Sequence, residues 1–146
     1  MKLKSDSLDK FFSIDPNKKQ EIPLLSSRVS AGFPSSAENY LEKSLDLNEL
    51  LVQHAAATFF LKVKGNSMIN ARINDGDILI VDRALTVRTN KIIIARINDE
   101  LTVKRILINA EKISLHAEND QYKPIEITSE MDFEVWGVVT YVIHKV

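Results

Sequence analysis

The hydrophobic pattern of the chain changes near residue 40. Before that point the sequence is polar, carries most of the prolines, and has one short apolar patch from Ile22 to Leu25. Such a composition favours extended and exposed chain over packed elements. We therefore expect a flexible or weakly docked N-terminal arm over residues 1–40 and a folded domain over residues 41–146.

Runs of β-branched and aromatic residues follow, separated by short polar segments that contain Asn, Asp and Gly. They are TFFLKVKG (58–65), DILIVD (77–82), KIIIARI (91–97), ELTVKRILI (100–108), KISLHA (112–117) and FEVWGVVTYVIHKV (133–146). This pattern predicts about six or seven short strands. The fold class that it indicates is mostly β, compact and largely antiparallel, with a hairpin closing at Asn98-Asp99.

Two short helices are also predicted. In SLDLNELLVQ, Asp46 is a suitable N-cap and Glu49 stands three residues later, which is the capping-box pattern for a helix that runs to about Gln53. A second short helix is predicted from Met68 to Ile73, directly after a strongly apolar strand.

The arm contains SSRVSAGFPSSAENY, in which Pro34 and the surrounding Gly and Ser residues prevent regular structure. The segment is therefore expected to be extended and accessible. A linker is its simplest interpretation.

The charge and composition exclude several classes of function. Nineteen basic and twenty acidic residues give a net charge of −1, so we expect no direct, sequence-specific binding to DNA. The chain has no cysteine, which excludes disulfides and thiol chemistry. No apolar run is long enough for a signal peptide or a membrane span, so a soluble, cytoplasmic protein is expected.

A metal site or another cofactor is not expected. The three histidines, His54, His116 and His144, are scattered and do not form a ligand motif. Asp75 and Asp77 flank a glycine before a strand, which is more typical of a turn than of a cation site.

Ser67, in KVKGNSMINARI, lies at a predicted junction between strand and helix, where unpaired backbone N–H groups can bind an oxyanion. A helix N-cap is the alternative interpretation of this serine. If Ser67 is a nucleophile, it needs a base, and a lysine can act as one when burial lowers its pKa.

Lys104, in ELTVKRILI, is the candidate base because it shares one strand face with Thr102 and with the apolar Ile106 and Ile108. The alternative is that Lys104 and its neighbour Arg105 are charges on an edge strand that discourage aggregation.

These features together resemble the LexA and UmuD family of self-cleaving serine peptidases. The resemblance is carried by the small-residue bond in the arm, GNSM after a strand, DGDILIVD and TVKR, and it extends from about Ile22 to the C-terminus. It is greatest to the UmuD branch, the accessory subunits of error-prone polymerase V. Unlike the family pattern, TNK and NDEL stand where turns with glycine are usual.

The resemblance implies that Ser67 is the nucleophile, Lys104 the general base and Ala31-Gly32 the cleaved bond. It also implies an oxyanion hole of the Ser67 and Asn66 N–H groups. The implied partners are a RecA filament on single-stranded DNA, which promotes cleavage, a second copy in a homodimer, and a UmuC-type catalytic polymerase subunit in SOS translesion synthesis.

Three alternatives remain. A LexA-like repressor would need a helix-turn-helix before the cleavage point, and the short polar arm does not suggest one. A signal-peptidase-like enzyme would also use Ser and Lys but would need a membrane anchor. The third is a non-catalytic dimeric binding module that regulates a polymerase while its Ser and Lys are inactive.

Overall fold

The computed structural model describes residues 11–12, 17–25, 28–34 and 42–146. These form two compact units, a larger one with residues 54–146 and the strand at Phe11–Phe12, and a smaller one between residues 17 and 53. The boundary expected between residues 40 and 41 lies outside the described residues. Each described helix is too short or too polar to cross a membrane.

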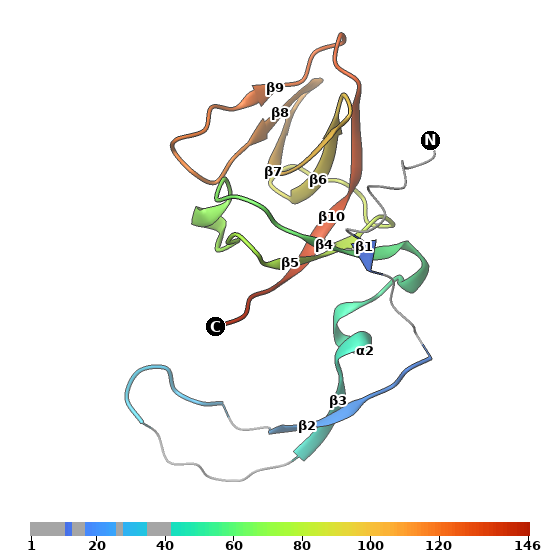
Figure 1. The fold of residues 1–146 in the computed structure, drawn as a ribbon, viewed down its shortest axis with the longest axis vertical. Coiled ribbons are helices and arrows are strands. Elements are labelled where there is room, and N and C mark those ends of the chain that lie inside the picture. The colour runs from blue at the N-terminus through green and yellow to red at the C-terminus, as the bar shows by residue number, and fades with distance from the viewer. Residues whose placement is uncertain (1–10, 13–16, 26–27, 35–41) are drawn as a thin grey trace. The chain divides into compact units, whose positions relative to one another are not determined.

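The larger unit is an eight-stranded antiparallel sheet with the order β1-β4-β5-β10-β6-β7-β8-β9 (Figure 1). Its strands are β1 (Phe11–Phe12), β4 (Thr58–Lys62), β5 (Ile78–Asp82), β6 (Ile92–Ile97), β7 (Glu100–Asn109), β8 (Lys112–His116), β9 (Ile125–Glu126) and β10 (Phe133–Ile143). The predicted fold class is confirmed, and each of the six predicted runs contains a strand. The very short β1 and β9 were not predicted.

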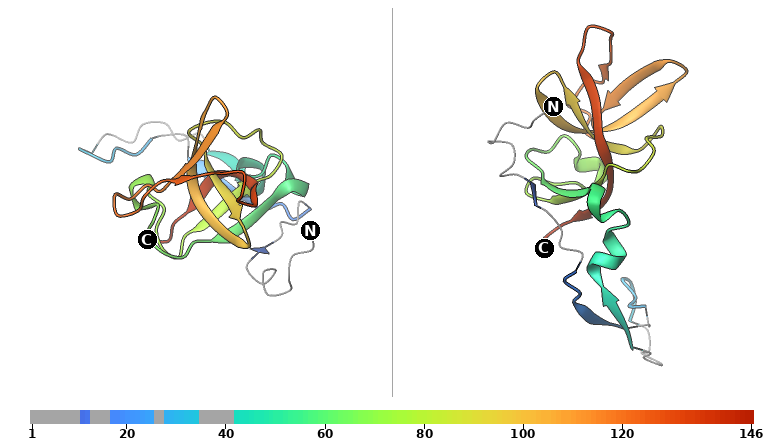
Figure 2. Two further views of the ribbon diagram at one scale, coloured as in Figure 1. Left: turned by 90° about the horizontal axis from the view of Figure 1, so that it is seen from above. Right: turned by 90° about the vertical axis from the view of Figure 1, so that its right-hand side faces the viewer.

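The last strand, β10, joins the two halves of this sheet. Residues 133–138 pair with β6 and residues 138–143 pair with β5. Figure 2 shows the length of β10 from two further sides. Register shifts occur near Gly137 and between Val139 and Tyr141, and such irregularities bend a strand and increase its twist.

The core lies on both faces of the central strands. Ile94 packs in one cluster, whereas its neighbours Ile93 and Ala95 pack in the other, because successive side chains of a strand point to opposite faces. This explains why KIIIARI is continuously apolar where a half-exposed strand would alternate.

Two turns contain an asparagine in the left-handed region, which favours glycine. Asn90, in TNK, has a φ of 68°, and Asn98, in the turn between β6 and β7, has a φ of 53°. Asparagine accepts the left-handed region more readily than other non-glycine residues. The hairpin predicted at Asn98-Asp99 is confirmed.

The smaller unit contains β2 (Glu21–Leu25) and β3 (Glu42–Asp46), which pair antiparallel, followed by α2 (Leu47–Leu51). The predicted N-cap is confirmed, because Asp46 Oδ1 accepts a hydrogen bond of 3.0 Å from the Asn48 N–H. The helix ends at Leu51, two residues before the predicted end. The apolar patch from Ile22 to Leu25, within the residues expected to form the arm, lies in β2.

Candidate active site

Ser67 lies in a loop that follows β4 and that we call the serine loop, residues 63–73. Gly65 has a φ of 92°, which favours glycine, and its N–H donates to Asp75 Oδ1 over 2.6 Å. Asp77 Oδ2 accepts from the Asn74 N–H over 2.8 Å. Both aspartates therefore hold a turn, as predicted.

Met68 anchors the serine loop in the core. It is 1% exposed and packs in the cluster that contains Leu79 and Ile94. The helix predicted at Met68 to Ile73 is a single 3-10 turn, Ile69–Ala71, whose N-cap residue is Met68 without a side-chain cap bond. Ser67 is therefore not the N-cap of this helix.

Lys104 lies on β7, which pairs with β6 on one side and with β8 on the other. It is directly opposite Ile93, and only 8% of its surface is exposed. The alternative that Lys104 is an edge-strand charge is therefore wrong, because β7 is an internal strand and the side chain is buried.

The structure brings the two candidates together: Ser67 Oγ lies 3.3 Å from Lys104 Nζ. The amine also lies 3.0 Å from Thr102 Oγ1 and 3.1 Å from the Val103 carbonyl oxygen. A neutral amine has two N–H donors and one lone pair. Donation to Val103 and Thr102 therefore leaves the lone pair for the proton of the Ser67 hydroxyl.

Burial lowers the pKa of Lys104 below its usual value. Within the described ranges no carboxylate forms an ion pair with this lysine, so no neighbouring negative charge opposes the shift. The site thus favours the neutral amine, which is the form that can accept a proton.

Backbone donors are available next to Ser67. In the described part of the chain, the N–H groups of Asn66 and Ser67 donate no hydrogen bond. Ser67 is half-buried and Asn66 is exposed. These two N–H groups are therefore free to bind the oxyanion that forms on a carbonyl oxygen when Ser67 Oγ attacks its carbon.

The segment that follows β8, residues 117–124, contacts the serine loop. Asn119 Nδ2 donates to the Asn66 carbonyl over 3.0 Å, and the Tyr122 hydroxyl donates to Asn66 Oδ1 over 3.3 Å. The backbone N–H of Asn70 donates to the Glu118 carbonyl over 2.8 Å. Sequence reasoning missed these contacts, since more than fifty residues separate Asn66 from Asn119 and no local pattern joins them.

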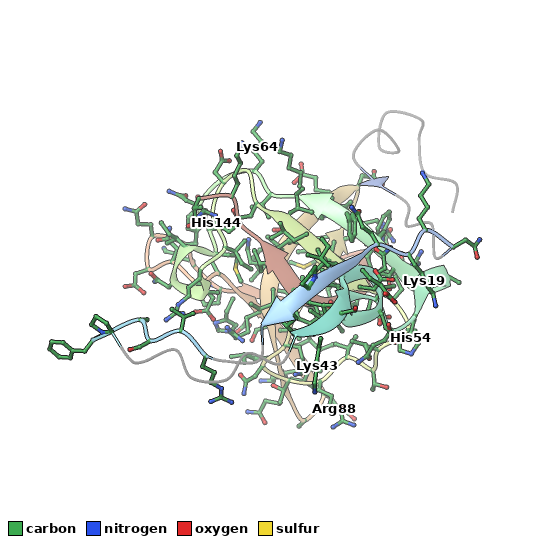
Figure 3. The ribbon with its side chains drawn as sticks, turned by 90° about the horizontal axis from the view of Figure 1, so that it is seen from below. Lys19, Lys43, His54, Lys64, Arg88 and His144 are labelled. Carbon is green, nitrogen blue, oxygen red and sulfur yellow. The ribbon has the colours of Figure 1, made fainter. Side chains whose placement is uncertain are left out.

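Two of the histidines pair with buried aspartates at the ends of β5. His54 Nδ1 lies 2.6 Å from Asp82 Oδ2, and His144 Nδ1 lies 2.6 Å from Asp77 Oδ1. The two histidines lie at separate places on the larger unit (Figure 3). Burial alone would raise the pKa of Asp77, but the Asn74 N–H and His144 together hold it below its usual value.

His116 lies elsewhere, with Nε2 2.8 Å from Ser114 Oγ. In the ranges that the structure describes, no group of three or more His, Asp or Glu side chains could hold a metal ion.

The bond between Ala31 and Gly32 belongs to the smaller unit. Residues 28–34 are exposed and form neither strand nor helix. Two apolar side chains flank the bond and are almost fully exposed, Val29 at 93% and Phe33 at 91%. The Gly32 N–H donates to Ser30 Oγ over 3.3 Å.

Comparison with known proteins identifies the class to which this fold and site belong. The profile of the family described as Peptidase S24-like matches residues 23–140. The chain therefore belongs to this family, whose members include self-cleaving serine peptidases.

Comparison with individual relatives shows which members of this family the chain resembles. The chain is 40% identical over 134 residues to Protein MucA of Salmonella typhimurium, which covers 92% of both chains. It is 42% identical over 127 residues to Protein ImpA of Shigella flexneri, covering 84% of this chain and 83% of ImpA. The LexA repressor of Glaesserella parasuis is 38% identical over 88% of this chain, but the match covers 61% of that repressor. The chain is thus a UmuD-like protein related to the SOS response.

Proposed function

We propose that this chain is a UmuD-like regulatory subunit of a translesion DNA polymerase, activated in the SOS response when it cuts itself between Ala31 and Gly32. Ser67 is the nucleophile and Lys104 is the general base. The observation that supports the peptidase activity best is the 3.3 Å contact between Ser67 Oγ and the buried amine. The regulatory role rests on the similarity to UmuD-like proteins.

In the first step, the neutral Lys104 amine accepts the Ser67 proton while Oγ attacks the Ala31 carbonyl carbon. The N–H groups of Ser67 and Asn66 stabilise the resulting oxyanion. The Lys104 ammonium then protonates the Gly32 nitrogen, and the Ala31–Gly32 bond breaks. Water, deprotonated by the same amine, hydrolyses the acyl-enzyme and releases Ser67.

A tethered substrate suits this site. Because the arm is part of the same protein, its effective concentration is high, and a slow site can still cut. The exposed segment 28–34 is accessible for binding in an extended form. Entry of the segment into the site is then the step at which cleavage can be controlled.

The proposed function also includes what promotes cleavage and which partners the cleaved chain joins. A RecA filament on single-stranded DNA promotes entry or cleavage of the segment. The shortened chain acts as a homodimer and joins a UmuC-type catalytic subunit. The match to UmuD-like relatives along most of their length supports these partners over a DNA-binding repressor.

The first test is intact-mass analysis of the full-length protein over time. We would incubate three proteins between about pH 7 and pH 10, with and without RecA filaments: wild type, Ser67→Ala and Lys104→Met. In wild type, the cleavage rate should rise with pH as the Lys104 amine loses its proton. Met matches the length of Lys and keeps the apolar packing of the site. We expect a product that begins at Gly32 and that neither variant forms.

Two outcomes would contradict the peptidase proposal. Unchanged cleavage in Ser67→Ala would assign the cut to a contaminating protease. An uncut wild type under all conditions, with RecA present, would favour the non-catalytic dimeric binding module. Co-purification with a UmuC-type subunit tests the polymerase role separately.

A further inference from the structure

Asn119 uses both ends of its side-chain amide. Its Oδ1 accepts a hydrogen bond of 3.0 Å from the Gln121 N–H, which closes a local turn. Its Nδ2 donates to the Asn66 carbonyl oxygen, also over 3.0 Å. One side chain therefore shapes its own segment and holds the serine loop.

The bond to Asn66 fixes the direction of the Ser67 N–H. A trans peptide is planar, so the Asn66 carbonyl and the Ser67 N–H point in opposite directions. The carbonyl accepts from Asn119 and, over 3.3 Å, from the Ile69 N–H. The Ser67 N–H must then point away from both donors, and it is free in the described part of the chain.

We propose that Asn119 is a positioning residue for self-cleavage, because its amide holds the Asn66–Ser67 peptide in the orientation that offers the Ser67 N–H to the oxyanion. This inference rests on the proposed function of Ser67. If the peptide rotated, the Asn66 carbonyl oxygen would replace the N–H, and an oxygen there would repel the developing negative charge.

Asn119→Asp is the sharpest variant for a test. A carboxylate keeps an acceptor for the Gln121 N–H, so the local turn is retained, but it cannot donate to the Asn66 carbonyl. Asn119→Ser gives a neutral comparison, because a hydroxyl can form a similar turn but is too short to replace the amide. Tyr122→Phe is the matched control, since it removes a contact to the Asn66 side chain and leaves the peptide untouched.

The readout is the pH–rate curve for cleavage of the full-length chain, with RecA filaments added, together with the melting temperature. We expect both Asn119 variants to lower the plateau rate by about 10-fold to 100-fold, less than the loss of a whole oxyanion donor. In Asn119→Ser, the pH midpoint set by Lys104 should stay unchanged, and the melting temperature should change little. Tyr122→Phe should cleave within about 3-fold of wild type, as expected for one weak exposed bond.

The possible results separate this inference from the proposed function. If Ser67→Ala and Lys104→Met abolish cleavage while both Asn119 variants cut like wild type, the positioning role is wrong and the dyad stands. An equal loss in Tyr122→Phe would also overturn it, since general contact between the two segments would then explain the effect. If Ser67→Ala cuts normally, the proposed function fails first.

Discussion

Met68 links the fold to the proposed nucleophile, because it is buried in the core directly after Ser67. Met68→Ala removes the Cγ methylene, the sulfur and the terminal methyl group from a site that is 1% exposed. Truncation of a buried methionine typically costs about 2–5 kcal/mol, the sum of lost transfer energy and the cavity left behind. At roughly 4 °C per kcal/mol, the melting temperature should fall by about 8–20 °C.

The same change should slow cleavage more than unfolding alone explains. Without the Met68 anchor, the serine loop can shift relative to Lys104, and a displacement of about 1 Å can reduce a rate by about 100-fold. We therefore expect at least a tenfold lower rate at temperatures where the variant remains folded. Thermal unfolding by circular dichroism gives the stability, and intact-mass analysis gives the rate.

Ile69→Ala is the matched control, because Ile69 is the next residue and is 47% exposed. Its truncation should lower the free energy of unfolding by no more than about 1 kcal/mol. A Met68→Ala melting temperature within 3 °C of wild type would refute the burial argument. A normal cleavage rate in a clearly destabilised Met68→Ala would refute the anchoring argument.

Three further changes test the site and the sheet. Thr102→Val removes the hydroxyl that lies 3.0 Å from Lys104 Nζ. Because this acceptor favours the ammonium form, its loss should lower the pKa of Lys104 further and move the pH–rate curve to lower pH. An unchanged midpoint of that curve would contradict the assigned contact. The pKa of Asp77 is lowered from 3.8, so its ionised form stabilises the protein above that pH, and this contribution is lost as pH falls through the lower folded pKa. Asp77→Asn should thus be less stable than wild type in urea at about pH 7, and the difference should shrink as the pH falls below 3.8. A difference that stays constant with pH would argue against the charge. Gly137→Ala would place a Cβ 2.6 Å from Val81 Cγ1 and should destabilise by about 1–3 kcal/mol, so an unchanged melting temperature would contradict the close packing.

Local patterns were sufficient to predict the long strands, because KIIIARI and ELTVKRILI are long β-branched runs with a turn between them. The cap at Asp46 was also predictable, since capping depends on neighbouring residues. The pairing of β2 with β3 was not, because it joins segments about twenty residues apart, and β2 carries a proline. Strands of two residues, such as β9, have no periodic signal at all.

The order of strands in the sheet explains why the burial of Lys104 could not be predicted. The sequence places Lys104 on a strand, but that strand could lie at an edge or inside the sheet. Its internal position depends on β6 pairing along one side and β8 pairing along the other. Both partners are neighbours of β7 along the chain, but no property of TVKR shows that both of them pair with it. The motif therefore identifies Lys104 as the candidate base, whereas burial of its side chain within the sheet lowers its pKa.

The two candidate groups are held by different kinds of interaction. Lys104 is fixed by β7, whose backbone is bonded on both sides along the sheet. Ser67 lies in a loop held by individual side chains, chiefly Met68 from the core and Asn119 from the segment after β8. A single substitution does not easily shift an internal strand, but it can remove one of the few contacts that hold a loop in place. Variants that lose cleavage while staying folded should therefore be found mainly on the serine side of the site.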